Sequence, residues 1–560
     1  MLNFSNDPQV AESQMQAVIF LMTTFGYIDG DFDQREKTFV RERIRELVKS
    51  RVDGAKVTDT IMRGELVDKF TTHFHEVFEQ IDARVRDLTN EPVATGEDPS
   101  AFVHARLKQQ CLELMQGFDK PGQEALLAGI DELPMADGEA HPAEVQFRSE
   151  LASFLEADLG LEIVDDGGGD HAKITVQAVV ELPPAGAVHP FFEPFEQHYK
   201  PEVIDQQIEA DLSLVDRARR CLEELRATGN GKLTGKKSFV EFVGQDPFLD
   251  GHVYVVPPKP GKTYDILVLG DLHGCYSVLK AAILQSQFFD KVNAYRADPG
   301  RPEPHLVLLG DYIDRGLFSL NGVLRTVLQL LVTAPQFVHV LRGNHEYYIE
   351  HEGKVYGGVQ PSEAINTLKP YVPIDAFRHY ISLFETLPNS LSFGDLFFVH
   401  GGIPKDRLVK ERWKDLSTLN DPDIRFQMMW SDPSKADVIP ADLQDKSSRF
   451  AFGKHQFRAF MQRIGAHTLF RGHEKVNEGF HLSYDGPEGK LVTLFSSGGR
   501  ENDDLPADSS YRTVTPMALT IRHDDQGTTL TPWAPDYKAY NDPERNGFFK
   551  VPPEIPLRTK

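Results

Sequence analysis

The sequence has few of the features that mark secreted, membrane-bound or nucleic-acid-binding proteins. Its 3 cysteines, Cys111, Cys221 and Cys275, lie far apart and show no CxxC spacing. They therefore indicate neither a disulfide framework nor a thiolate zinc site, and they fit a reducing compartment. No run approaches the roughly 20 apolar residues that a membrane span needs. The first residues also lack the positive charge of a signal peptide, so we expect a cytoplasmic protein with no membrane partner.

Positive charge is scarce as well. The chain carries 60 Lys and Arg residues against 84 Asp and Glu residues, which gives a formal net charge of -24. Such a field repels the phosphate backbone of nucleic acids and favours cations or basic partners. We therefore expect no nucleic acid among the partners. At 560 residues the chain exceeds what one hydrophobic core usually serves, so its length predicts more than one domain.

The first part of the chain shows helical periodicity and no convincing strand. Apolar residues recur there at spacings of three and four, as in Val40, Ile44 and Leu47. We predict an all-α domain over residues 1–160. Two acidic segments in this domain look like copies of one helix–turn–helix unit. Their carboxylates are Asp29, Asp31, Asp33 and Glu36 in the first segment, and Asp137, Glu139 and Glu144 in the second.

These carboxylates allow two interpretations. Oxygen ligands at this density can hold a hard divalent cation, although the spacing is not that of an EF-hand, because Gln34 stands at the turn glycine. Alternatively the carboxylates cap helices, since Asp33 precedes Glu36 by three residues as in a capping box. Through these segments and the helices after them, the region resembles the TerB (tellurite-resistance-like) helical family. The resemblance implies an all-helical regulatory module that takes an additional cation or a protein partner.

The rest of the chain divides by composition. Residues 161–260 combine a glycine-rich break, a proline-rich stretch and an amphipathic segment from Val203 to Leu225, which predicts a connector with one long helix. Residues 526–560 are rich in Pro and Asn and are expected to form a C-terminal tail. The residues between them, 261–525, follow a pattern of their own and are predicted to form a second folded domain.

Six short apolar runs in residues 261–525 each lead into glycine and polar side chains. Runs of this length fit buried strands, and helical patterns between the first three indicate βαβ units with a largely parallel sheet. Polar residues at the carboxyl ends of such strands face a shared crevice. The six pairs of run and following segment are Ile266–Leu269 with Gly270-Asp-Leu-His-Gly274, Leu306–Leu309 with Gly310-Asp-Tyr-Ile-Asp-Arg-Gly316, Phe337–Leu341 with Arg342-Gly-Asn-His-Glu346, Leu396–Val399 with His400-Gly-Gly402, Thr468–Phe470 with Arg471-Gly-His473, and Leu491–Phe495 with Ser496-Ser-Gly-Gly499.

The side chains after these runs have the composition of a two-metal site. Carboxylate, amide and imidazole donors without a thiolate suit catalytic Mn, Fe or Zn better than a structural zinc. Two metals about 3.5–4 Å apart and bridged by one carboxylate could hold a phosphate and generate a hydroxide nucleophile at neutral pH. One histidine after a strand is usually structural, but a structural role does not account for five such clusters. The candidate ligands are Asp271, His273, Asp311, Asn344, His400 and His473.

These motifs resemble the phosphoprotein phosphatase (PPP) family of calcineurin-like metallophosphoesterases, and Trp430-Ser-Asp-Pro433 also matches. The resemblance implies an α/β fold, an α/β/β/α metallophosphoesterase sandwich, here preceded by the all-α domain. It also implies two divalent metal ions, with Mn as first choice and Fe or Zn as alternatives. One metal would be held by Asp271, His273 and Asp311, and the other by the bridging Asp311 with Asn344, His400 and His473.

The resemblance also assigns catalytic roles by position. His345, paired with Asp314, would protonate the leaving alkoxide. This role is chemically reasonable, since an alkoxide is a poor leaving group and a neighbouring carboxylate keeps an imidazole protonated. Arg315 and a second arginine would bind the phosphate oxygens and stabilise the charge of the transition state.

The sequence departs from the family at two positions. The second arginine of the family lies upstream of a Phe-x-Phe-Gly segment, whereas this chain reads Arg449-Phe-Ala-Phe-Gly453 and has Lys446 at the upstream position. We assign the role to Arg449. The Asn-Tyr pair that follows the last strand in eukaryotic members is also missing. Arg500 could replace it as a substrate contact, or the substrate differs.

The predicted function is metal-dependent hydrolysis of phosphomonoesters, with phosphoserine and phosphothreonine of proteins as the substrates. One alternative is a dinucleoside polyphosphate hydrolase with a similar metal core, and another is an inactive scaffold that binds phosphoproteins. The segment Asp314-Arg315-Gly316 favours the phosphatase, because it supplies both the partner of the acid and a phosphate-binding arginine. The presence of every expected ligand argues against the inactive scaffold.

Overall fold

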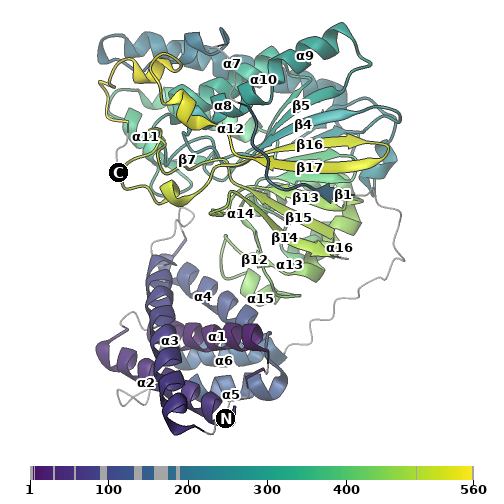
Figure 1. Cartoon of the computed structure of the whole chain (residues 1–560). Coiled ribbons are helices and arrows are strands. Elements are labelled where there is room, and N and C mark those ends of the chain that lie inside the picture. Colours follow the sequence, from purple (N-terminus) through teal and green to yellow (C-terminus); the bar gives the residue numbers. More distant parts are fainter. Residues whose placement is uncertain are drawn as a thin grey trace. The chain divides into compact units, whose positions relative to one another are not determined.

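The computed structural model falls into two units, each with its own core. It describes residues 4–5, 7–28, 32–55, 59–88, 97–130, 142–156, 174–183, 189–486 and 489–557. The helical unit contains Met1–Glu162 together with Ser434–Gly453. The α/β unit contains Ile163–Pro433 and Lys454–Lys560. Figure 1 shows both units, with many of their elements labelled.

In the described residues of the first part of the helical unit, all regular elements are helices, as the periodicity predicts. Helix α1 is the central one, because it is buried continuously from its middle to its end, and Ile19 and Leu21 have no exposed surface. The rings of Phe25 and Phe147 meet edge to face, with centroids 5.1 Å apart. The helices are α1 (Pro8–Gly26), α2 (Gln34–Gly54), α3 (Thr60–Leu88), α4 (Pro99–Met115), α5 (Lys120–Ile130) and α6 (Pro142–Glu156), joined by the short α15 (Ala441–Gln444).

The first acidic segment caps a helix. The Asp33 side chain accepts hydrogen bonds from Arg35 N at 2.6 Å and Glu36 N at 2.9 Å. The Glu36 carboxylate in turn accepts from Asp33 N at 2.8 Å, so the capping box at the start of α2 is complete. Four carboxylates of the acidic segments lie outside the described residues, and the cation site stays a prediction. They are Asp29, Asp31, Asp137 and Glu139.

The α/β unit contains two mixed β-sheets. In the first sheet the strand order is β1 (Ile174–Val176), β17 (Gly527–Trp533), β16 (Ala518–Asp524), β4 (Tyr264–Leu269), β5 (Glu303–Leu308) and β6 (Val338–Val340). In the second sheet it is β14 (Phe480–Gly486), β15 (Gly489–Leu494), β13 (Thr468–Arg471), β10 (Leu396–Val399), β9 (Ser390–Phe393), β3 (Val253–Val256) and β2 (Phe248–Asp250). Shorter strands are β7 (Tyr348–His351), β8 (Lys354–Gly357), β11 (Asp432–Pro433) and β12 (Ala451–Phe452).

All six apolar runs are strands, but they belong to two sheets. The first three form the parallel neighbours β4, β5 and β6. The last three form the parallel neighbours β10, β13 and β15 of the second sheet. Each sheet as a whole is mixed rather than largely parallel, because hairpins add antiparallel strands, such as β16–β17 beside β4 and β9 beside β10.

Helices cover the outer faces of the two sheets, which gives the expected α/β/β/α order (Figure 1). Residues of both sheets, such as Val268 and Phe470, share one apolar core. On the second sheet, Phe457 of α16 contacts Tyr484 of β14, with ring centroids 5.2 Å apart. The helices of this unit are α7 (Ile204–Gly229), α8 (Tyr276–Gln285), α9 (Phe288–Ala297), α10 (Arg325–Thr333), α11 (Glu363–Leu368), α12 (Ile374–Thr386), α13 (Asp406–Arg412), α14 (Pro422–Trp430) and α16 (Lys454–Ile464). A π-helical segment, η5 (Ser319–Leu324), precedes α10, and short 3₁₀ turns are η2 (Glu193–Phe195), η3 (Pro201–Val203), η4 (Phe239–Phe242), η6 (Leu416–Asn420), η7 (Ser510–Thr513), η8 (Tyr537–Tyr540) and η9 (Gly547–Phe549).

The stretches expected as connector and tail contribute to the α/β unit. The long helix of the connector is α7, whose Val215 and Leu222 are buried in the shared core. Strands β1, β2 and β3 also come from this stretch. The predicted tail, residues 526–560, begins one residue before β17 and contains the whole strand, and its Phe548 and Ile555 are buried in the same core. In the described part of the chain, no helix is both long enough and apolar enough to cross a membrane.

The capping box predicts how much Asp33 stabilises the helical unit by capping α2 and how much by its charge. Asp33→Ala should lower the free energy of unfolding by about 1 kcal/mol, because it removes the acceptor for two helix N–H groups. Asp33→Asn is the matched control, since asparagine caps as well as aspartate but carries no charge. Chemical denaturation of the full chain, followed by circular dichroism, measures both variants. Equal losses in both would show that the charge of Asp33 matters rather than its cap.

Candidate metal and phosphate site

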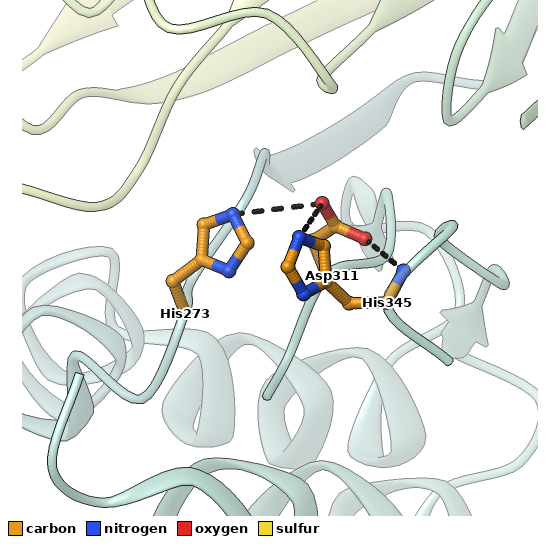
Figure 2. A group of neighbouring side chains, drawn as sticks. All are labelled: His273, Asp311 and His345. Carbon is orange, nitrogen blue, oxygen red and sulfur yellow. Dashed lines mark hydrogen bonds and ion pairs between the residues drawn. The ribbon is translucent and has the colours of Figure 1, made fainter. Parts of the chain in front are cut away.

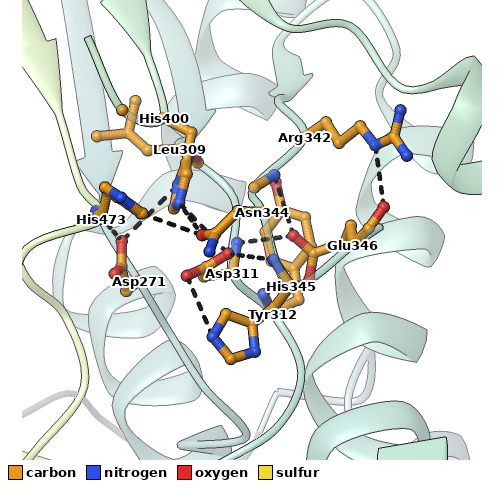
Figure 3. Close-up of polar contacts among 12 residues, drawn as sticks. Asp271, Leu309, Asp311, Tyr312, Arg342, Asn344, His345, Glu346, His400 and His473 are labelled. Atoms are coloured by element: carbon orange, nitrogen blue, oxygen red, sulfur yellow. Dashed lines mark hydrogen bonds and ion pairs between the residues drawn. The ribbon is translucent and has the colours of Figure 1, made fainter. Parts of the chain in front are cut away.

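Polar side chains from both sheets meet at the carboxyl ends of their strands (Figure 3). From the first sheet, Asp271, Asp311 and Asn344 follow β4, β5 and β6. From the second sheet, His400 and His473 follow β10 and β13. All five are buried, with at most 8% of their surface exposed. The structure therefore brings together the predicted ligands, of which the first and the last are 202 positions apart in the sequence.

The backbone at this site adopts conformations that L-residues rarely take. Five non-glycine residues of the site have positive φ angles, a conformation that costs free energy and is kept only where the surroundings enforce it. They are His273 (41°), Asp311 (53°), Asp314 (65°), Arg315 (66°) and His473 (67°). Gly270, which precedes Asp271, is required for a different reason. A Cβ on Gly270 would lie 1.9 Å from Leu494 O of the second sheet, so a larger residue would push the two sheets apart.

The Asp311 carboxylate is the centre of the cluster. Its Oδ2 lies 3.5 Å from His273 Nε2, and its Oδ1 lies 3.4 Å from His400 Nε2. Its Oδ1 also accepts a hydrogen bond from His345 N at 3.0 Å. Figure 2 shows this carboxylate between His273 and His345. Two groups of side chains that could hold a metal ion share Asp311: His273 with His345, and His400 with His473.

Two histidines are oriented by backbone carbonyls. His273 Nδ1 is 2.9 Å from Ile313 O, and His400 Nδ1 is 3.0 Å from Leu309 O. Because a carbonyl can only accept, Nδ1 carries the proton in both rings and the Nε2 lone pair faces the cluster. Ligand histidines in metal sites are held in this way. Burial also lowers the pKa of both rings well below the usual range, so both are neutral and able to bind a cation.

The orientation of Asn344 tests whether a cation fits. Asn344 Oδ1 lies 2.8 Å from His400 Nε2 and 3.1 Å from His473 Nδ1. If the amide were rotated by half a turn, its Nδ2 would donate to both Asp311 oxygens at 3.2 Å. In the orientation found, electron-rich atoms face one another. A cation among them would stabilise this arrangement, whereas hydrogen bonding alone would favour the rotated amide.

Buried carboxylates supply the second test. Asp271 Oδ2 is buried and has no hydrogen-bond partner in the described structure, and the other oxygen accepts from His473 N at 2.8 Å. Burial raises the pKa of Asp271 to about 7. Burial, with the nearby charges of Asp271 and Glu346, raises the pKa of Asp311 well above its usual range. Carboxylates this close and this buried need positive charge to stay ionised, which divalent ions would supply. The residues present therefore fit a metal site.

His345 and Asp314 form a hydrogen-bonded pair beside the cluster. His345 Nδ1 lies 2.8 Å from Asp314 Oδ2, and Asp314 Oδ1 accepts from Ala364 N at 2.8 Å. Burial raises the pKa of Asp314 to about 6, against the opposing effect of Arg315. The carboxylate therefore fixes the ring, and His345 Nε2 faces Asp311 at 4.0 Å. A proton on Nε2 would therefore point toward the Asp311 carboxylate.

Of the predicted arginines, the structure places Arg315 beside this pair. Its guanidinium contacts Glu363 at 3.2 Å and Pro361 O at 3.1 Å. Arg500 is exposed on the loop after β15, where its carbonyl accepts from Arg512 at 3.0 Å. Arg449 and Lys446 lie in Ser434–Gly453, the stretch that belongs to the helical unit.

Three residues with roles at the site were missed by the sequence interpretation. Glu346 accepts from Asp311 N and Tyr312 N, both at 2.8 Å, and so holds the loop of the central carboxylate. Asp432 pairs with Arg471 at 2.7 Å inside the fold. Both residues stand in the quoted motifs, which could have drawn attention to them. The ring of Tyr511 lies 5.4 Å from that of His273, and no motif signals it.

Comparison with known proteins identifies the family to which this part of the chain is similar. The family model of the calcineurin-like phosphoesterases matches residues 264–477. Residues 264–477 are a calcineurin-like phosphoesterase domain. Five of the six polar segments that follow the strands lie inside this range, and the segment after β15 lies outside it. The match confirms the metallophosphoesterase fold that the motifs predict.

Curated relatives of the phosphoesterase domain are serine/threonine phosphatases by name. A "probable serine/threonine-protein phosphatase" of Encephalitozoon cuniculi is 26% identical over 258 residues, which are 45% of this chain and 51% of the relative. The serine/threonine-protein phosphatase 4 catalytic subunit of Eremothecium gossypii is 26% identical over 236 residues, 41% of this chain and 68% of the relative. The chain thus spans about half the length of the first relative and about two thirds of the second.

Solved structures show weaker overall likeness. A serine/threonine phosphatase from Saccharomyces cerevisiae matches with 19% identity and a TM-score of 0.37, over 58% of this chain and 90% of that protein. A cold-active protein-tyrosine phosphatase of a Shewanella species matches with 19% identity and a TM-score of 0.28, over 51% of this chain and 82% of that protein.

The cluster predicts that divalent ions stabilise the phosphoesterase domain. Mn²⁺ at 100 times its dissociation constant should raise the free energy of unfolding by about 2.7 kcal/mol, and a chelator should remove this gain. Asp311→Asn should lose it, because the shared ligand is weakened. Asp265→Asn, in β4 and paired with Arg522, is the matched control and should keep it. Thermal unfolding with elemental analysis of bound metal measures both variants. Metal binding by the Asp311→Asn variant equal to that of the control would contradict the assignment.

Proposed function

We propose that this protein hydrolyses phosphomonoesters, with phosphoserine and phosphothreonine of proteins as the substrates and Mn as the first choice of metal. The observation that carries the proposal is the pair of His345 and Asp314 at 2.8 Å, beside a cluster that fits two cations. The names of the curated relatives support the choice of substrate.

The side chains divide the work as follows. Asp271, His273 and Asp311 would hold one divalent ion. Asp311 would share the second ion with Asn344, His400 and His473. When bound, such ions neutralise the charge of the phosphate and make water a competent nucleophile at neutral pH. The buried carboxylates would hold the ions in place before the substrate binds.

His345 would protonate the ester oxygen as the bond to phosphorus breaks. A serine alkoxide is a strong base, so its departure without a proton is slow, and a positioned acid accelerates it by about 10²–10⁴. Asp314 holds the ring by Nδ1 and leaves the Nε2 proton for the leaving group. Arg315, held by Glu363, would bind phosphate oxygens, and we assign a second such contact to Arg449.

The same pair argues against the two alternatives. A dinucleoside polyphosphate hydrolase cleaves an anhydride, whose phosphate leaving group departs without full protonation and has less need of an acid. An inactive scaffold would have no use for an oriented acid at a site that fits two cations. Neither alternative requires a buried carboxylate that holds the His345 ring at 2.8 Å.

The role of His345 can be tested with two substrates. His345→Asn should lower kcat for a phosphoserine peptide by about 10²–10⁴. It should lower kcat for p-nitrophenyl phosphate much less, since nitrophenolate leaves without a proton. Metal content should stay unchanged, and the exposed His351→Asn is the matched control. Equal losses on both substrates would show that His345 does not act as the acid.

The substrate class can be tested with a panel of phosphorylated compounds. Phosphoserine, phosphothreonine and phosphotyrosine peptides are compared with dinucleoside polyphosphates at equal concentration and with Mn²⁺ present. We expect the highest kcat/KM for phosphoserine or phosphothreonine peptides. Turnover of dinucleoside polyphosphates alone would refute the proposal, and a preference for phosphotyrosine would correct its substrate.

A further inference from the structure

A groove lies between helix α7 and the turn that joins α11 to α12. Its volume is about 260 Å³, and all of its lining residues belong to the α/β unit. Pockets for small molecules usually measure about 300–1,000 Å³, so this groove is better matched to one or two side chains of a peptide. Helix α7 lies outside the residues that match the phosphoesterase family, 264–477. This wall of the groove is therefore a feature of this chain and not of the matched domain.

The floor of the groove is apolar. Ile208 of α7, Val372 in the turn and Ala376 of α12 are each at most 7% exposed. All three belong to the core shared by the two sheets, so they form a firmly packed surface. Tyr371 also lines the groove and keeps 38% of its surface exposed. An exposed tyrosine beside buried apolar residues is typical of the contact surfaces between proteins.

Negative charge surrounds this floor. Asp205 and Glu209 of α7 and Asp375 of α12 are exposed and line the groove. No lysine or arginine is among the described residues that line it. Arg378, which does not line the groove, pairs with Asp375 but also with Glu350, so it offsets only part of the charge. The rim is therefore complementary to the lysines and arginines of a partner.

The stretch of chain that forms the second wall also holds the predicted acid pair and phosphate contact. Glu363, at the start of α11, contacts Arg315 at 3.2 Å, and Ala364 N donates to Asp314 at 2.8 Å. Helix α11 rises about 1.5 Å per residue, and three further residues lead to Tyr371, so the groove begins within about 20 Å of Glu363. A flexible peptide of about 12 residues has an average reach close to this distance.

We propose that this groove docks a segment of the phosphoprotein substrate that carries apolar side chains between lysines or arginines. The apolar side chains would lie on Ile208, Val372 and Ala376, and the basic ones beside Asp205 and Glu209. This inference rests on the proposed function, because it adds a second contact to a substrate whose phosphate is bound at the metal cluster. A second contact makes the binding of the phosphate intramolecular, so it lowers KM and leaves the chemical step unchanged.

Three phosphoserine peptides with the same phosphosite test the docking. The first carries a flexible linker of about 12 residues and a tail of leucines flanked by lysines. In the second the leucines are replaced by serines, and the third has no tail. The leucine tail should lower KM about tenfold at unchanged kcat. The serine tail should lower KM much less, because charge attraction between exposed groups is weak and screened by salt. Equal KM values for all three peptides, or equal gains from both tails, would overturn the inference.

A charge reversal at the rim shows where the tail binds. Glu209→Lys should remove the advantage of the leucine tail and leave KM for the peptide without a tail unchanged. Glu224→Lys is the matched control, because Glu224 is exposed on the same helix, about 22 Å further along it. This variant has the same change in net charge and should keep the advantage. Equal losses in both variants would show that the overall charge attracts the tail, and the groove would be refuted.

Fluorescence anisotropy measures docking without turnover. A labelled leucine tail that lacks a phosphosite should bind the natural chain and the Glu224→Lys variant equally, and the Glu209→Lys variant at least tenfold more weakly. Tyr371→Ser should also weaken binding, because it removes an exposed apolar wall. Failure of this tail to bind the natural chain would overturn the inference, while the proposed phosphatase function would stand. Binding by a chain that hydrolyses no phosphopeptide would refute the proposed function and confirm the docking groove.

Discussion

The site depends on holding several carboxylates close together inside the protein. Asp311 and Asp271 are buried, share histidine neighbours and have raised pKa values. Such an arrangement is unfavourable while the carboxylates are ionised, and a bound cation would stabilise it. The strained backbone, the backbone-held histidines and the orientation of Asn344 all serve this one requirement. The hydrogen-bonded pair of His345 and Asp314 lies beside this cluster, and His345 Nε2 faces Asp311 at 4.0 Å.

Much of this site could be predicted from the sequence, because each of its residues stands in a short motif directly after a strand. Each predicted ligand follows a buried strand within a few residues and is accompanied by glycine, so its position in the fold and its chemistry can be inferred from one short segment. Asp271, Asp311 and His400 are of this kind. The capping of α2 by Asp33 was also visible, because both members of the box lie within four residues.

The remainder depends on contacts between distant parts of the chain. The division of the six strands into two sheets is decided by hairpins and edge pairings, such as β16 beside β4, that leave no spacing in the sequence. Tyr511 reaches His273 from a loop without any motif. Ile439 and Leu443 look like ordinary apolar residues, and nothing in their neighbourhood reveals that their partners lie in helices near the start of the chain.

The placement of Ser434–Gly453 has a consequence for how the chain is made. Proteins fold from the N-terminus as they leave the ribosome, and early domains usually complete their core before later ones appear. Here the helical unit is synthesised first, but part of its core comes from Ile439 and Leu443. Its core is complete only after most of the phosphoesterase domain has been made. The helical unit therefore precedes the phosphoesterase domain in the chain but completes its core only alongside that domain.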